Sequence, residues 1–99
     1  MANEHALIRA TTDAAHADRL LQDETLTDAF KGLEEAYTRA WRNTSIDDVA
    51  AREKLFLAIN IVGKVRNHLT ALVSNGKLAK AELEELARTA ERKKRLGLF

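Results

Sequence analysis

The residues that could carry out chemistry are few, and they stand in no catalytic spacing. His5, His16 and His68 form neither an HExxH motif nor any other paired spacing that would bind zinc. Two Gly-Lys pairs lack the remainder of a phosphate-binding loop, and no strand precedes them. The sequence therefore predicts no catalytic residue, no metal site and no cofactor, and we expect a protein that is not an enzyme.

Two arginines interrupt an otherwise apolar helical face. Arg66 lies near the centre of the apolar arc of the segment 46–74, and Arg52 lies at its margin. A buried guanidinium needs a carboxylate partner, and Glu34 or Glu35 on the preceding segment is nearest by topology. We predict a buried ion pair within the chain or between subunits. The alternative is an anion site formed where several such arginines converge in an oligomer.

The C-terminal end is the second candidate site, because a basic run is followed there by apolar residues. A basic helix end is usually a solvated end that suits the helix dipole, but exposed apolar side chains beyond it favour a docking partner. We predict a partner-binding tail made of Arg92, Lys93, Lys94, Arg95, Leu96, Leu98 and Phe99.

The elements that carry these residues are predicted to be helices. The 99 residues include no Pro and only four Gly, and Ala, Leu, Glu, Lys and Arg are abundant, as in helical proteins. We expect one all-α domain, in which an antiparallel helical hairpin with one long helix is flanked by shorter helices. The predicted parts are an N-terminal arm at 4–22, a hairpin at 25–74, a C-terminal helix at 78–95 and a tail at 96–99.

Local signals set these boundaries. Thr25 with Asp28 has the spacing of an N-terminal cap, as do Ser45 with Asp48 and Thr44 with Asp47. The run 74–76, Ser-Asn-Gly, has the composition of a helix C-cap, which predicts a stop there. The inward face of the arm is mostly Ala, so we expect it to bury little area and to dock weakly.

The segment LFLAINIV at 55–62 is apolar on nearly every side. A helix with that pattern needs neighbours on every side, and a chain of this length has few helices to offer. We therefore predict a homo-oligomer, whose interface includes Leu55, Phe56, Leu57, Ile59, Ile61 and Val62.

Charge is unevenly distributed, although the net charge is only +1. Residues 1–51 contain five Lys or Arg against ten Asp or Glu, whereas residues 52–99 contain eleven against five. The two halves either pack on each other, within one chain or between subunits, or the basic half binds nucleic acid or an acidic partner. The absence of Cys fits a reducing compartment, and we expect neither a signal peptide nor a membrane-spanning helix.

The stretch LTDAFKGLEEAYTRAW…DDVAAREKLFLAINIVGKVRNHLTALVSNGKLAKAEL resembles short helical proteins encoded among the packaging and head genes of tailed phages. Its organisation is similar to the oligomerisation hairpin of small terminase subunits. The resemblance implies a ring-forming hairpin at 26–73 and an element at 88–99 that contacts the large terminase. Residues 1–22 are too short and too Ala-rich for the DNA-binding helix-turn-helix of that family.

The resulting functional prediction is an oligomeric phage packaging or assembly protein in the cytoplasm of a bacterial host. It would act as a helical ring or adaptor for the large terminase. Two alternatives remain open: a helical adaptor that binds and inhibits a host protein, and a small nucleic-acid-binding protein that uses the basic C-terminal half. Salt-dependent retention on DNA would favour the second of these.

Overall fold

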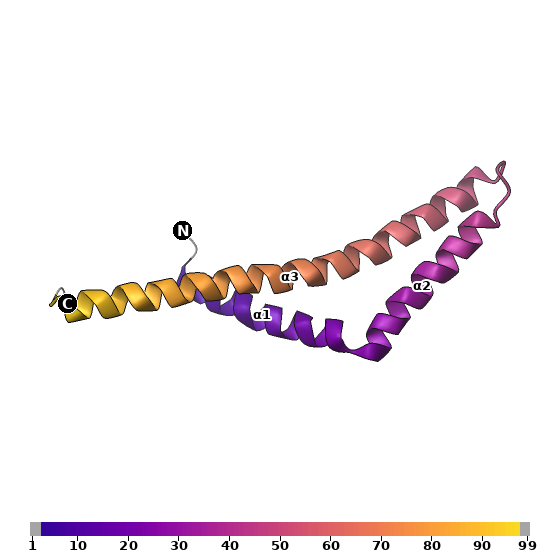
Figure 1. Cartoon of the computed structure of the whole chain (residues 1–99). Coiled ribbons are helices and arrows are strands. Elements are labelled where there is room, and N and C mark those ends of the chain that lie inside the picture. The colour runs from indigo at the N-terminus through magenta and orange to yellow at the C-terminus, as the bar shows by residue number, and fades with distance from the viewer. Residues whose placement is uncertain (1–2, 98–99) are drawn as a thin grey trace.

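The computed structural model describes residues 3–97, and the secondary structure of this part of the chain is entirely α-helical, as predicted. The helices are α1 (Glu4–Gln22), α2 (Glu24–Arg42) and α3 (Val49–Arg95). With 47 residues, α3 is about 70 Å long at 1.5 Å per residue, and it spans most of a molecule measuring 75 × 27 × 15 Å. Figure 1 shows α1 lying along the middle of α3, and α2 returning beside the N-terminal part of α3.

The predicted break at 74–76 is wrong, because α3 continues through it without interruption. The separate helices predicted at 46–74 and 78–95 are one element. An apolar seam explains the continuity: Leu72, Gly76, Ala79 and Leu83 are spaced by four, three and four, so the face that must be covered crosses the Ser-Asn-Gly run in phase. The glycine that does end the helix is Gly97, whose φ is +72°, a left-handed conformation that glycine adopts without steric cost.

Gly76 is buried because α1 approaches α3 closely at this position. A Cβ built on Gly76 would overlap the Cβ of Ala14 and lie 3.2 Å from the carbonyl oxygen of Ala10. The absence of a side chain therefore serves helix–helix packing here, and tertiary contact overrides the capping tendency of the local sequence.

The junction between α1 and α2 is the single residue Asp23. Its extended backbone (φ −72°, ψ 113°) ends α1, and its carboxylate accepts a hydrogen bond of 2.9 Å from the amide of Leu26. The predicted cap at Thr25 and Asp28 is therefore wrong, and Asp23 is the N-cap of α2. The apolar stripes that end at Leu21 and begin at Leu26 are five residues apart, so in one straight helix they would point in different directions. The bend at Asp23 allows both stripes to face α3.

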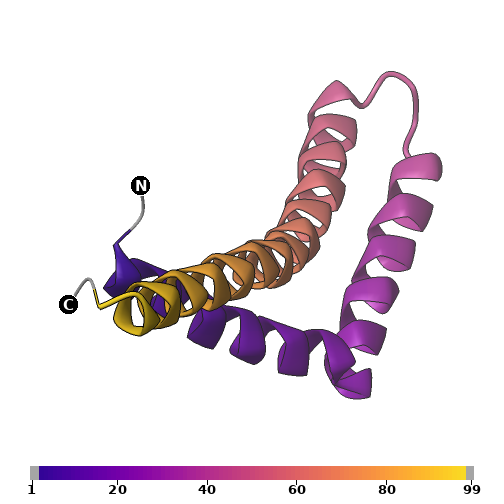
Figure 2. The same cartoon turned by 60° about the vertical axis from the view of Figure 1, so that its left-hand side comes forward.

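The loop 43–48 turns the chain from α2 into α3. Asp48 is the N-cap of α3 and accepts from the amide of Ala51 at 3.2 Å, so α3 begins three residues later than predicted. α2 and α3 lie closest beside this loop and diverge toward the junction at Asp23, forming an open V (Figures 1 and 2).

Burial is concentrated between α1 and α3, which corrects the expectation that the arm docks weakly. In the described part of the chain the buried residues are Leu7, Ala17, Gly76 and Ala79, and all four belong to these two helices. α2 contains no buried residue. Small side chains let two helices approach closely, so an Ala-rich face buries its residues more completely than the aromatic face of α2 does.

Candidate protein–protein interface

Arg52 is held beside the loop by an aromatic ring and a hydroxyl. Its guanidinium carbon lies 4.7 Å from the centre of the Trp41 ring, and its Nη1 donates a hydrogen bond of 2.9 Å to Thr44 Oγ1. The Thr44 hydroxyl in turn donates to the carbonyl oxygen of Trp41 at 2.6 Å. Arg52 forms no ion pair within residues 3–97, so the predicted pairing with Glu34 or Glu35 of the same chain does not form. Its contacts join the two ends of the loop instead.

Arg66 reaches across the open V to α2, where it does pair with a predicted partner. Its Nη1 lies 3.2 Å from Glu34 Oε1, and its guanidinium carbon lies 5.6 Å from the centre of the Phe30 ring. The Arg66 and Glu34 side chains are 35% and 32% exposed, so the pair is not buried as predicted. The helices diverge here, and water reaches both groups. Glu35 is exposed and forms no ion pair in the described part of the chain.

The two arginines are not brought together within one chain. They are separated by about 21 Å along α3 at 1.5 Å per residue, and each already has partners. An open hollow beside Arg66 is also lined by Lys31, both glutamates and apolar residues such as Leu21 and Phe30. Its two cations are matched by two carboxylates, so the lining does not favour an anion.

An exposed apolar ridge runs along the N-terminal half of α3. It follows a spacing of four residues and consists of Val49, Glu53, Leu57, Ile61 and Val65. Its four apolar members are 67%, 53%, 59% and 46% exposed, in chain order, and Glu53 is exposed as well. A hollow beside the ridge is lined by Ile61, Lys64, Val65, His68 and Leu69. The name α3 ridge is used below for residues 49, 53, 57, 61 and 65, and it does not include the other residues that line the hollow.

The α3 ridge overlaps only partly with the predicted interface. Leu57 and Ile61 belong to both sets, and Phe56 is 55% exposed beside the ridge. In contrast, Leu55, Ile59 and Val62 are half-buried, because the chain's own helices cover part of that face. Val49 and Val65 were not among the predicted interface residues. The spacing of four, read separately from the inward seam, is the signal that would have identified them.

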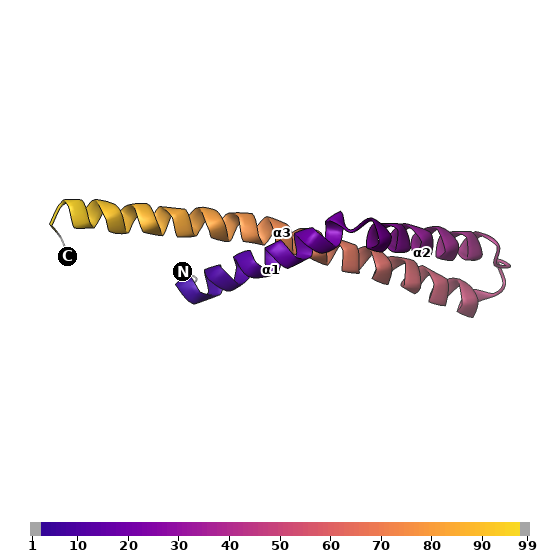
Figure 3. The ribbon, with the colours of Figure 1, turned by 90° about the horizontal axis from the view of Figure 1, so that it is seen from below.

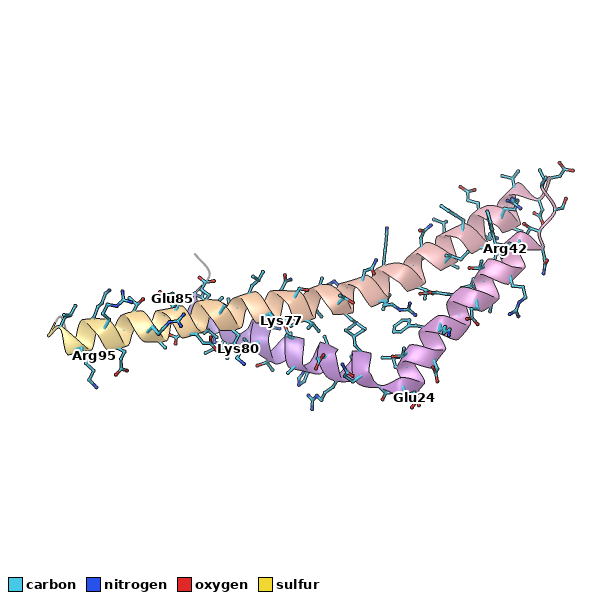
Figure 4. The ribbon with its side chains drawn as sticks, viewed as in Figure 1. Glu24, Arg42, Lys77, Lys80, Glu85 and Arg95 are labelled. Carbon is cyan, nitrogen blue, oxygen red and sulfur yellow. The ribbon has the colours of Figure 1, made fainter. Side chains whose placement is uncertain are left out.

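The C-terminal end of α3 extends past the N-terminal end of α1, and no other helix of the described residues lies beside it (Figures 1 and 3). The predicted tail residues Arg92 to Arg95 form its last helical turn and are exposed. Leu96 is the helix C-cap and is 67% exposed. Figure 4 places Glu85 and Arg95 on this projecting end. The predicted tail residues Leu98 and Phe99 lie outside the described residues.

Other kinds of site find little support in residues 3–97. That range contains no group of three or more His, Asp or Glu side chains that could hold a metal ion. No polar or charged side chain is buried in it. None of its helices combines the length and the apolar character needed to cross a lipid bilayer.

Comparison with known proteins provides no relative. No family model matches the chain, and neither the curated proteins nor the solved structures include a match.

Proposed function

We propose that the protein is a non-enzymatic helical assembly protein, which self-associates and presents the C-terminal end of α3 to a protein partner. The observation that carries this proposal is the amount of surface that the isolated chain exposes. Its accessible surface is 7863 Å², whereas a compact monomer of this mass exposes about 5,700 Å². The radius of gyration is 21.4 Å, against about 12.6 Å for a compact domain of this length.

The exposed apolar residues favour an oligomer over an elongated monomer. Large apolar side chains that are half exposed or more lie on α1, in the loop and along α3. Contiguous patches of this kind in a soluble protein are usually covered by a partner. A protein that binds partners through its folded surface also gains stability from them.

The specific form of the proposal is a phage packaging protein of small-terminase type, acting in a bacterial host. It rests on the resemblance of residues 26–83 and on the projecting basic end, which would contact the large terminase. Basic side chains there would speed encounter with an acidic surface, and Leu96 would provide part of the buried anchor. Direct DNA recognition is not part of the proposal, since the described residues before α2 form the single helix α1 and not a helix-turn-helix.

The test compares the full chain with a chain truncated after Glu91. We expect the truncated chain to keep its helicity and its oligomeric mass, because the deleted residues that are described are all exposed. It should lose binding to the purified large terminase encoded in the same gene cluster. As a matched control, replacing the four basic residues 92–95 by Gln should mainly slow association, whereas Leu96→Ala should mainly speed dissociation.

Three outcomes would contradict the proposal. A full chain that sediments as an 11.1 kDa monomer at micromolar concentration would remove self-association. A truncated chain that dissociates would make the C-terminal end an assembly element instead of a docking element. Binding to DNA with a steep salt dependence, without binding to the terminase, would favour the nucleic-acid alternative.

A further inference from the structure

The α3 ridge has the geometry of a helix-packing surface that lacks its partner. Side chains spaced by four residues form ridges that fit into the grooves of a second helix, and the commonest helix packing in globular proteins uses such ridges on both helices. Leu57 and Ile61 lie at the middle of the ridge and are more than half exposed. The hollow beside Ile61 and Val65 provides the corresponding groove.

Among the Asp, Glu, Lys and Arg residues from position 49 to position 81, Glu53 is the single carboxylate, and it stands between Arg52 and Lys54. Lys64 borders the same groove as Ile61 and lies about one turn beyond it. Both Glu53 and Lys64 are exposed, and neither forms an ion pair within residues 3–97.

We infer that a second copy of the chain covers the α3 ridge, with the two α3 helices packed antiparallel about a twofold axis that passes between Leu57 and Ile61. In that arrangement Leu57 of one copy packs against Ile61 of the other, and Glu53 of each copy lies near Lys64 of the other. A parallel arrangement would place Glu53 beside Glu53 and Lys64 beside Lys64, so the charges select the antiparallel one. This inference depends on the self-association proposed above and adds its surface, its orientation and its symmetry.

The elongated chain as a whole exposes more surface than one such contact would bury. The chain exposes roughly 2,200 Å² more than a compact monomer of its mass, and a stable interface needs about 800 Å² from each partner. An interface with twofold symmetry uses the same surface on both copies and therefore closes at two. The α3 ridge consequently gives a dimer, and any larger ring requires a second surface.

The first experiment measures mass and dimer affinity for the full chain. Ile61→Glu should raise the dissociation constant by at least about tenfold, as expected when a charge replaces a central apolar anchor. Leu78→Glu is the matched control, because Leu78 lies on the same helix, is 71% exposed and is outside the ridge. It should leave the dissociation constant unchanged. Equal effects of the two variants would overturn the assignment of the surface.

The second experiment tests orientation with charge reversals. Glu53→Lys alone and Lys64→Glu alone should each weaken the dimer by roughly threefold to tenfold, because each puts like charges together twice. The two single variants mixed in equal amounts should form a heterodimer as stable as the original dimer, since both contacts are then of opposite sign. The double variant should also recover. If mixing and the double variant both fail to restore affinity, the antiparallel arrangement is wrong.

The failures can be told apart. A full chain that is monomeric overturns the proposed function together with this inference. A stable oligomer that is insensitive to Ile61→Glu overturns only the inference, and self-association then proceeds through another face.

Discussion

The two helices that pack against α3 do so in opposite ways. α1 presents small side chains such as Ala14 and Ala17 to Gly76 and its neighbours, and the buried residues of the described chain all lie in this contact. α2 presents Phe30 and Trp41, whose rings meet the arginines of α3, and it buries none of its own residues. The comparison shows that close approach, rather than side-chain size, decides how completely a face of α3 is covered.

The largest loss of stability is expected from a substitution at Leu7, in the contact between α1 and α3. This side chain is 5% exposed, so Leu7→Ala should lower the free energy of unfolding by about 2–4 kcal/mol. The neighbouring Ile8 is 50% exposed, and Ile8→Ala should cost about 1 kcal/mol or less. Chemical denaturation of both variants measures the difference. Similar losses would mean that α1 is not packed on α3 as described.

A smaller effect is expected at the bend that orients the two contacts. Asp23→Ala removes the N-cap of α2 and should cost about 1 kcal/mol, read from the melting temperature or from denaturation. Thr25→Ala is the control, because Thr25 lies inside α2 and not at its cap. A larger loss for Thr25→Ala than for Asp23→Ala would restore the cap predicted from the sequence.

The smallest effect is expected at Arg66, on the open side of the molecule. Both members of the Arg66–Glu34 pair are about one-third exposed, so Arg66→Ala should lower the free energy of unfolding by about 1 kcal/mol or less. A double-mutant cycle with Glu34→Ala isolates the pair itself. A loss of about 3–5 kcal/mol on Arg66→Ala would indicate the buried ion pair predicted from the sequence.

The helical class, the first two helices and the Arg66–Glu34 partnership could be predicted from the sequence, because composition, spacing and topology determine them. The continuity of α3 could not be predicted from the Ser-Asn-Gly run alone. A glycine can either end a helix or admit a close neighbour, and only the seam through Leu72, Gly76 and Ala79 distinguishes the two. The exposure of Arg66 depends on how far α2 and α3 diverge, a tertiary feature that no local pattern records.

The exposed α3 ridge was only half predictable for a related reason. The run 55–62 is apolar on all sides, so the sequence indicates that some of it needs a partner outside the chain. Which residues those are depends on the directions from which α1 and α2 approach. Leu55, Ile59 and Val62 are partly covered by the chain itself, and Val49 and Val65 are left exposed in their place.

The close packing of α1 against α3 at Gly76 organises the described structure, and two matched glycine substitutions test this packing. A Cβ on Gly63 would meet nothing within 4 Å, whereas a Cβ on Gly76 would overlap Ala14. Gly63→Ala should raise the free energy of unfolding by about 0.5–1 kcal/mol through helix propensity. Gly76→Ala should lower it by about 1–3 kcal/mol through overpacking, and adding Ala14→Gly should recover part of that loss. If both substitutions raise stability equally, α1 does not approach α3 at Gly76, and the close helix packing described here is wrong.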